Sequence, residues 1–384
     1  MVNGVSKFMD KEDNNKKKNL YKAMQIILCI ASIIFLSLFV NELFIQPFRS
    51  KKAMNKIQDL YQNPALIISP KPEKTSYIAE ETSPILEATR PSPTLNKGSD
   101  RSSDETLTSD EIDIHENSLQ ESSNKSPDIA TEVDTLGRLI EFQELLKINE
   151  DIKGWISIEG TYINYPVLQS STDDPEYYLY RNFFKENDKA GSIFLDIKSS
   201  VEDNSKHLIL HGHNMHTTDS MFHALMEYKK SSFYHDHPII KFDTIYEKAQ
   251  WKIFSIFVTN GTSLWEPLFD YTRTDFENDS DFMNFVYQLR LRSLYNIDSV
   301  DVNEKDQLLT LSTCSYELNN YRTVIVARKI REGEEITVDL DTVTINPNPL
   351  YPKSWYDYYG GKAPSFTSFE EALENGEINW YSGN

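Results

Sequence analysis

The sequence predicts a mostly β fold with helical additions, arranged as a closed or partly open β-barrel. Two observations lead to this prediction. Short apolar runs of strand length recur from about residue 155 to residue 329, with polar turn residues between them. Apolar residues at the three-to-four-residue spacing of a helix occur in only a few short stretches of the same region. The whole pattern fits within one domain of ordinary size.

The ordered part is expected to begin with a helix and to carry a second, longer helix late in the chain. The first helix has an apolar stripe over 136–146, with Asp134 or Thr135 as its N-cap. The late helix, 280–295, follows a capping Asp279 and is inserted between late strands. The other expected elements are a short helix over 220–228 and strands over 155–158, 162–164, 192–195, 207–210, 239–242, 250–258, 307–312 and 321–329.

The last stretch, 332–384, is predicted to be an aromatic-rich C-terminal extension. Its first part, 334–344, alternates like a strand. Further on, Ser368 and Glu371 have the spacing of a capping box for a short helix over 369–373. Tyrosine and tryptophan are too frequent here for a disordered tail, so we expect the extension to dock on the barrel.

The N-terminal region contains an almost wholly apolar stretch over 24–45, long enough to span a bilayer core of about 30 Å. A cleaved signal peptide is the competing interpretation. An uncleaved anchor is favoured because no small-residue cleavage motif follows the apolar stretch. Lysines lie on both sides, with a slight bias toward a cytoplasmic N-terminus. The sequence therefore predicts a single-pass membrane protein whose large C-terminal part is outside the cell.

These patterns predict five parts along the chain. Proline, serine, threonine and acidic residues dominate from about residue 63 to 130, and such a composition buries too little apolar surface to fold. The predicted parts are a cytoplasmic tail over 1–23, a transmembrane anchor over 24–45, a flexible extracellular stalk over 46–132, a folded domain over 133–331 and the extension over 332–384.

Charge and cysteine content exclude two classes of protein. The net charge is −20, which argues against a nucleic-acid partner because such a partner requires basic patches. The two cysteines are Cys29, within the apolar stretch, and Cys314, within the folded domain. They are not expected to meet, so a disulfide framework is excluded and Cys314 is predicted to be a free thiol.

A lone cysteine at the end of an apolar strand, with a histidine and an arginine elsewhere, has the composition of a nucleophilic acyl-transfer site. Cys314 ends such a strand, and the neighbouring Ser312 and Thr313 make the position more polar than a core site. A thiol of this kind is activated by nearby positive charge. The alternative is a buried structural cysteine, since free cysteine is among the most buried residue types.

Two further residues are candidates for the same site. His213 follows a similar strand after Gly212, where it can act as a base toward the thiol. Arg322 begins the strand after Cys314, so adjacent antiparallel strands would bring its guanidinium near the sulfur. A loop histidine and a strand-edge arginine without roles are the alternatives, and a zinc site formed by His211, His213 and His216 is another.

These motifs resemble those of the sortases, cysteine transpeptidases of Gram-positive cell surfaces, over roughly residues 136–331. The sequence Thr310-Leu-Ser-Thr-Cys314 with Arg322 is similar to the signature strand of the family, and His211-Gly-His-Asn214 is similar to its histidine motif. The helical lead-in and the late helical insertion resemble class B. Further matching motifs are Asn149-x-Asp-Ile-x-Gly-Trp-Ile156, Thr161-x-Ile-Asn-Tyr-Pro-Val-x-Gln169, Tyr177-Tyr-Leu179 and Gly191-Ser-Ile-Phe-Leu-Asp196.

The resemblance implies a sortase-like closed barrel and assigns roles to particular residues. Cys314 would be the nucleophile, His213 the acid/base partner, and Arg322 the group that positions substrate and stabilises the oxyanion. Substrate contacts are expected from Ser312, Thr313 and Asn214.

The resemblance also implies a reaction and its partners. The thiolate would attack the threonine carbonyl of a C-terminal sorting signal, of Asn-Pro-x-Thr type, on a secreted protein. An amine of a peptidoglycan precursor would then resolve the thioacyl intermediate, with no metal or organic cofactor. A hydrolytic cysteine protease and a non-catalytic anchored surface module are the alternatives.

Overall fold

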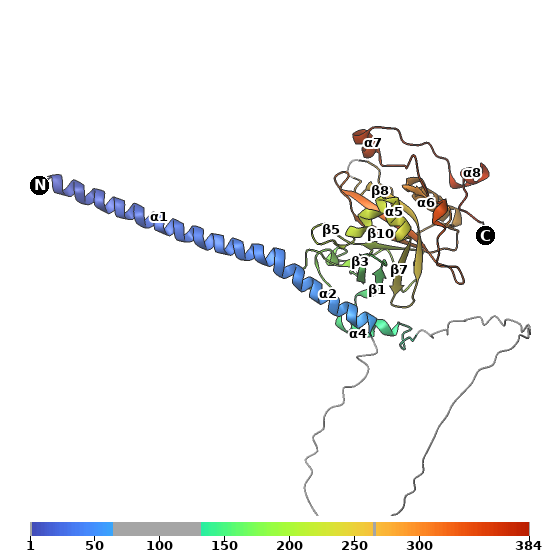
Figure 1. Ribbon diagram of the computed structural model, residues 1–384, viewed down its shortest axis with the longest axis horizontal. Helices are drawn as coiled ribbons and strands as arrows, with labels where there is room; N and C mark the ends of the chain where they lie inside the picture. The colour runs from blue at the N-terminus through green and yellow to red at the C-terminus, as the bar shows by residue number, and fades with distance from the viewer. Residues whose placement is uncertain (1, 64–131, 264–265, 384) are drawn as a thin grey trace, which may run out of the picture. The chain divides into compact units, whose positions relative to one another are not determined.

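The computed structural model describes residues 2–63, 132–263 and 266–383, with side chains from residue 18 onward. Eight strands form a closed barrel in the order β1-β2-β3-β4-β10-β11-β8-β7 (Figure 1). The prediction of a mostly β fold with helical additions is therefore confirmed, in its closed form. The strands are β1 Ile152–Ser157, β2 Asn164–Gln169, β3 Ile193–Leu195, β4 His207–His211, β7 Ile239–Thr244, β8 Gln250–Asn260, β10 Leu308–Cys314 and β11 Tyr321–Lys329.

Two strand pairs in the barrel are parallel, β2 with β3 and β4 with β10, and the other pairs are antiparallel. β8 is buried along nearly its whole length. One of its faces lines the barrel interior, and helix α6 (Asp279–Arg292) covers the other, where Ser255 Oγ donates to the carbonyl of Leu289 at 2.7 Å. This double burial explains the long run of apolar residues in β8.

The predicted helices at the start of the domain and before β10 are present, but their bounds and caps differ from the prediction. A 3-10 turn (η2, Ile140–Phe142) and α4 (Gln143–Ile148) form the lead-in, and α6 lies between β8 and β10 as expected. Asn278, rather than Asp279, caps α6, because its side chain accepts a hydrogen bond from the Asp281 amide at 3.0 Å. The strand expected over 162–164 begins only at residue 164.

The helix expected over 220–228 is wrong in its first half. Residues Ser220–Met221 form strand β6, which pairs with β5 (Asn214–Met215), and the 3-10 helix η4 begins only at His223 (His223–Lys229). Asp219 and Met221 have φ angles of 48° and 57°, which no α-helix contains. The apolar spacing there reflects burial against the barrel. Helix α5 (Ser231–Asp236) follows.

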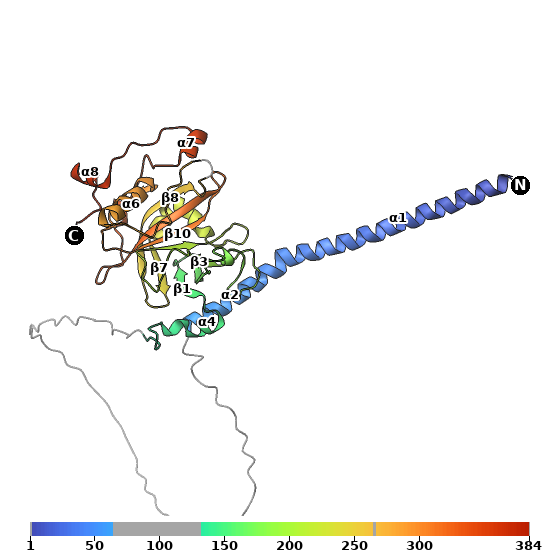
Figure 2. The same ribbon diagram turned by 180° about the vertical axis from the view of Figure 1, so that it is seen from behind.

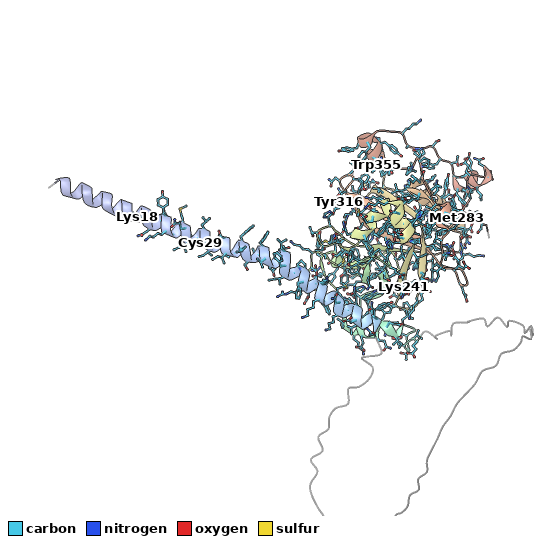
Figure 3. All side chains as sticks on the ribbon, in the orientation of Figure 1. Lys18, Cys29, Lys241, Met283, Tyr316 and Trp355 are labelled. Carbon is cyan, nitrogen blue, oxygen red and sulfur yellow. The ribbon has the colours of Figure 1, made fainter. Side chains whose placement is uncertain are left out.

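The N-terminal helices are joined to the barrel through contacts of α2. Helix α1 (Val2–Val40), a π-helical turn (η1, Asn41–Ile45) and α2 (Gln46–Gln62) follow one another without a break. The helical run Lys18–Gln62 is long and apolar enough to cross a membrane, by length and composition only, and a signal sequence near an N-terminus passes the same test. None of its most apolar window is buried. Figure 3 shows Cys29 on this helix.

Helix α2 occupies the first part of the predicted stalk and packs against the barrel. Ile57 is 1% exposed, the Tyr61 ring stacks on Trp155 at 4.3 Å, and the Tyr61 hydroxyl donates to Asp243 at 2.7 Å. The prediction of a flexible stalk that starts at residue 46 is wrong for 46–62, because this stretch buries an apolar stripe. The rest of the predicted stalk, 64–131, lies outside the described residues.

The C-terminal extension docks on the barrel, as expected. Helix α8 (Phe369–Glu374) lies beside α6 (Figure 2), and Phe369 and Trp380 are buried in the core. Ser368 caps α8 by accepting from the Glu371 amide at 3.2 Å. The other elements of the extension are the 3-10 turn η5 (Leu340–Thr342), strand β12 (Thr344–Ile345), which pairs with β9 (Tyr295–Asn296), and helix α7 (Lys353–Tyr359).

The strand expected over 334–344 is wrong. Glu334 instead pairs with Arg328, which is fully buried, and with Lys252 at 2.7 Å. Burial opposes ionisation of Glu334, but the hydrogen bonds from Arg328 and Lys252 outweigh it and lower the pKa of this carboxyl. These ion pairs hold Glu334 against the barrel, and the only regular elements that begin in this described stretch are the 3-10 turn Leu340–Thr342 and the two-residue strand Thr344–Ile345.

Candidate active site

The nucleophile candidate is exposed at the end of a strand that is otherwise buried. Every residue of β10 before Cys314 is buried, whereas Cys314 is exposed. In the antiparallel register of β10 and β11, Cys314 lies directly opposite Arg322. Side chains at directly opposed positions share one face of a sheet, with their Cβ atoms about 5 Å apart. The sulfur and the guanidinium therefore extend from neighbouring points of the same surface.

Arg322 has room at this position because a glycine lies beside it. A Cβ atom on Gly261 would lie 2.9 Å from the Arg322 Cζ atom, so a larger residue would displace the guanidinium. The Arg322 Nη1 atom donates to the carbonyl of Tyr321 at 3.1 Å. Nearby, the hydroxyl of the buried Tyr271 is 3.0 Å from Ser312 Oγ. Burial raises the pKa of Tyr271, so this phenol is neutral and can donate a hydrogen bond.

His213 reaches the same end of the barrel through the chain that leaves β4. The Gly212 amide donates to the Ser312 carbonyl at 3.2 Å, and Thr313 Oγ1 donates to the Gly212 carbonyl at 2.8 Å. These bonds tie the segment after β4 to β10. A Cβ atom on Gly212 would lie 2.4 Å from Ile193 Cδ1 and 2.8 Å from the ring of the buried Phe222, so a larger residue would force both side chains to shift. The exit from β4 predicted at this glycine thus has a packing reason.

The hydrogen bond of His213 defines which ring nitrogen is free. Its Nε2 atom lies 2.8 Å from the carbonyl oxygen of Leu179. A carbonyl only accepts, so Nε2 carries the proton and Nδ1 is the basic nitrogen of the neutral ring. Burial lowers the pKa of His213, and the Leu179 carbonyl opposes that shift only in part. The resting ring is therefore neutral near pH 7 and can accept a proton at Nδ1.

Asn214 connects the histidine segment to the cysteine. Its Nδ2 atom donates to the Cys314 carbonyl at 2.9 Å, and its Oδ1 atom lies 2.5 Å from Nδ1 of His223. The other ring nitrogen of His223 lies 3.5 Å from the Asp219 carboxylate. The Tyr316 hydroxyl donates to the Asn214 carbonyl at 3.3 Å. Both ends of the amide side chain are therefore engaged within the protein, next to the nucleophile candidate.

The structure brings the predicted site residues together at one end of β4, β10 and β11. Ser312 and Thr313 are each 2% exposed, and their hydroxyls bond to Tyr271 and to the Gly212 carbonyl. These contacts position the strand, and substrate contacts of Ser312, Thr313 and Asn214 stay predictions. Sequence reasoning missed Tyr271, which lies in an irregular segment, and His223, whose contact depends on the β5–β6 turn.

The candidate zinc ligands do not converge. Among the described residues, no group of three histidine, cysteine or acidic side chains lies close enough to hold a metal ion. His211 pairs with Asp196 at 2.9 Å, His213 bonds to the Leu179 carbonyl, and the His216 ring packs against His223 at 5.3 Å. The zinc interpretation therefore has no support from the described part of the chain.

Known proteins resemble this chain over the barrel. The sortase domain model matches residues 156–330. Sortase B of Staphylococcus aureus is 41% identical over 193 residues, which are 50% of this chain and 75% of that protein. Sortase B of Listeria monocytogenes is 36% identical over 197 residues, 51% of this chain and 74% of that protein. The structure of a Staphylococcus aureus sortase B–substrate complex is 41% identical, covers 50% of this chain and 85% of that chain, and has a TM-score of 0.45.

The fold and these matches define a cysteine transpeptidase of the sortase type. More narrowly, the chain belongs to the class B sortases. The resemblance inferred from the motifs is confirmed. The C-terminal extension lies beyond the residues that the family model matches.

Proposed function

We propose that this class B sortase is anchored in the membrane and joins secreted proteins to an amine of the cell-wall precursor. The observation that carries the proposal is the position of the exposed Cys314 directly opposite Arg322, with the His213 segment bonded to the same strand. The substrate is a C-terminal sorting signal of Asn-Pro-x-Thr type. The proposed localisation is the cell membrane, on the basis of the apolar segment 24–45, and the slight lysine bias on its N-terminal side supports a cytoplasmic N-terminus and an extracellular barrel.

The first half-reaction acylates the enzyme. Neutral His213 takes the proton of the Cys314 thiol at Nδ1, and the thiolate attacks the threonine carbonyl. The carbonyl electron pair moves to its oxygen, where the Arg322 guanidinium offsets the negative charge. When the tetrahedral intermediate collapses, the carbon–nitrogen bond breaks. His213 then gives its proton to the departing amine, and a thioester remains on Cys314.

The second half-reaction releases the product. The amine of the peptidoglycan precursor attacks the thioester carbonyl and loses a proton to His213. The carbon–sulfur bond breaks, a new amide bond forms, and the proton returns from His213 to the sulfur. Each step conserves protons and electrons and uses only the three side chains and the two substrates.

The anchor connects to the barrel through a helix in this proposal. The membrane segment continues into α2, and α2 packs against the barrel through Ile57 and Tyr61. A helix of this length spans about 25 Å. The barrel is thus tethered close to the membrane, where lipid-linked precursor and newly secreted protein both arrive.

The proposal is tested by incubating the full-length enzyme with a panel of signal peptides and an amine nucleophile, followed by mass spectrometry. We expect an amide product joined after threonine. The Cys314→Ala variant should form neither thioacyl enzyme nor product, whereas the matched control Cys29→Ala should do both normally. Cleaved peptide without any ligated product would instead identify a hydrolase. Thioacyl enzyme in the Cys314→Ala variant would exclude the proposed nucleophile.

A further inference from the structure

The turn between β10 and β11 connects the two residues proposed to act on the substrate carbonyl, Cys314 and Arg322. It runs over residues 315–320, between Cys314 and Arg322. The Ser315 amide donates to the Tyr321 carbonyl at 2.9 Å, which extends the strand pairing one step beyond Cys314. The same Tyr321 carbonyl accepts from Arg322 Nη1. A shift of this turn would therefore move the thiol and the guanidinium relative to each other.

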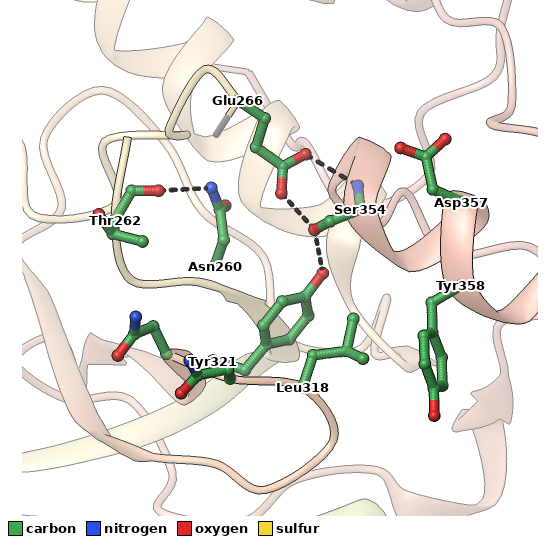
Figure 4. Close-up of a pocket in the computed structure, with 10 residues that line it drawn as sticks. Asn260, Thr262, Glu266, Leu318, Tyr321, Ser354, Asp357 and Tyr358 are labelled. Atoms are coloured by element: carbon green, nitrogen blue, oxygen red, sulfur yellow. Dashed lines mark hydrogen bonds between the residues drawn. The ribbon is translucent and has the colours of Figure 1, made fainter. Parts of the chain in front are cut away.

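The C-terminal extension holds the base of this turn through a directed chain of hydrogen bonds. Ser354 Oγ, in the first turn of α7, contacts a carboxylate oxygen of Glu266, and the Ser354 amide donates to the other oxygen at 3.0 Å. A carboxylate only accepts, so the Ser354 hydroxyl donates to Glu266. That hydroxyl lies 2.6 Å from the Tyr321 hydroxyl, which must therefore be the donor in their bond. Figure 4 shows the chain from Tyr321 through Ser354 to Glu266.

A second contact from the extension reaches the turn itself. The Tyr359 hydroxyl, at the end of α7, donates to the Glu317 carbonyl at 3.0 Å. On the barrel side, the Glu317 carboxylate contacts Lys229 and Ser315. Burial opposes ionisation of Glu317, but these hydrogen bonds lower the pKa of its carboxyl overall. The turn is thus held by hydrogen bonds and an ion pair, from the extension through Tyr359 and from η4 through Lys229.

Aromatic packing makes the contact from the extension rigid. The Trp355 ring stacks on Tyr351 at 4.1 Å, with an interplanar angle of 8°, and lies 4.5 Å from Tyr359. It also approaches the Tyr321 ring at 6.3 Å, and Tyr321 is only 2% exposed. Aromatic pairs of this kind hold a defined geometry at little cost in side-chain entropy. The hydroxyl of Tyr321 therefore has one orientation.

We propose that the C-terminal extension is a clamp that positions Arg322 against Cys314 for acylation. Tyr321, Ser354 and Tyr359 are positioning residues in this proposal, since they act through the β10–β11 turn and not on the substrate. The inference rests on the proposed roles of Cys314 and Arg322. It adds a function for the residues beyond the sortase domain match, which ends at 330. A barrel without this extension would have to hold the same turn by other means.

The pocket beside the hydrogen-bond chain makes a clean test possible. It has a volume of about 390 Å³ and is lined by Glu266, Tyr321, Ser354 and Tyr358, among others (Figure 4). Water in a pocket of this size can bond to a Tyr321 hydroxyl that has lost its partner. Removing the Ser354 hydroxyl should therefore leave the Tyr321 hydroxyl without a fixed orientation, while the fold stays intact.

The experiment compares Ser354→Ala with the matched control Tyr358→Phe, which removes an exposed hydroxyl from the same helix. Both changes are made in the full chain carrying Cys29→Ala, and again together with Arg322→Lys. We expect Ser354→Ala to lower kcat for peptide cleavage five- to tenfold with KM nearly unchanged, and Tyr358→Phe to change it less than twofold. In the Arg322→Lys background the effect of Ser354→Ala should vanish, because the positioned fork is already absent.

An activity-independent measurement separates this inference from the proposed function. Alkylation of Cys314 by iodoacetamide at pH 7 reports how well a nearby cation favours the thiolate. Ser354→Ala should slow alkylation severalfold with Arg322 present and leave it unchanged with Arg322→Gln, which removes the cation. If the enzyme forms no thioacyl species but alkylation follows this pattern, the proposed function fails and the clamp stands. Equal effects in both backgrounds, or no effect at all, would overturn the clamp.

Discussion

Asn214 offers a sharp test of how the site is held together. Its amide side chain bridges the Cys314 carbonyl, at 2.9 Å, and Nδ1 of His223, at 2.5 Å. Asn214→Ala removes both bonds and adds no bulk. Because Asn214 is only 9% exposed, the two groups it leaves behind are partly shielded from water. The change should therefore loosen the main chain at the nucleophile while the barrel stays folded.

The expected magnitude follows from the burial of the two abandoned groups. A polar group left unpaired in a protein interior costs about 1–3 kcal/mol. Cys314 is exposed, so water can reach its carbonyl, and the cost lies toward the lower end of that range. We expect a loss of about 2 kcal/mol in the free energy of unfolding for the two groups together. A small displacement of the thiol should also slow acylation about tenfold, equivalent to about 1.4 kcal/mol in activation free energy.

The assay is the single-turnover rate of thioacyl formation, measured by intact-protein mass spectrometry, together with urea unfolding. Two variants sharpen it. Asn214→Asp should be at least as slow as Asn214→Ala, because an anionic oxygen would face the Cys314 carbonyl. His223→Ala keeps the donor to that carbonyl and should cost only about threefold by the same reasoning. Wild-type acylation in Asn214→Ala, or faster acylation in Asn214→Asp than in Asn214→Ala, would refute the positioning role.

Three further predictions concern stability. Burial, opposed in part by a hydrogen bond to the Arg273 carbonyl, lowers the pKa of His207 to about 4. As the pH falls, His207 is therefore protonated in the unfolded state before it is protonated in the folded state. The free energy of unfolding should fall by about 2 kcal/mol between pH 7 and pH 5, and by less in His207→Gln. Urea titrations at both pH values would measure the difference. Tyr61→Phe should destabilise the fold by about 1–3 kcal/mol without changing acylation, because the buried Asp243 loses a donor; an unchanged urea midpoint would contradict this. Replacing 64–131 by a linker of about eight residues should stabilise the fold by roughly 1–2 kcal/mol, since a shorter loop closes at lower entropic cost; a lower melting temperature would show that the segment has a structural role.

The parts of the fold that follow from local pattern were predictable, and the parts that depend on distant partners were not. Most strands and α6 were located because their apolar periodicity is long and is bounded by turn residues. The stripe Met54, Ile57 and Tyr61 in α2 also has helical spacing, but it is flanked by lysines and a polar stretch, which hid it. The burial of this stripe depends on contacts of Tyr61 with Trp155 and Asp243, and both partners lie far away in the sequence.

The candidate site also has features that the sequence predicts and features that it does not. A short turn between two strands makes the opposition of Cys314 and Arg322 an expected consequence of antiparallel pairing, and the register agrees. The parallel pairing of β4 with β10 brings the His213 segment alongside, but no sequence pattern predicts which strands become neighbours in a closed barrel. The partner of His213 is a main-chain carbonyl, that of Leu179, and main-chain groups leave no trace in residue identity.

The state of His213 determines what the rest of the proposed site must accomplish. Burial favours the neutral ring, and the Leu179 carbonyl, by accepting from Nε2, leaves Nδ1 as the only nitrogen that can take a proton. In the proposed mechanism, proton transfer from the thiol then creates a thiolate and an imidazolium together in a partly buried site. Such a charge pair is costly unless another charge stabilises the anion. Arg322 lies opposite the sulfur and cannot lose its own proton, so in the proposed mechanism it would stabilise first the thiolate and then the oxyanion. A guanidinium fixed by the turn on which the C-terminal extension packs can serve both anions in sequence, because the negative charge moves by only two bonds, from the sulfur through the carbonyl carbon to its oxygen.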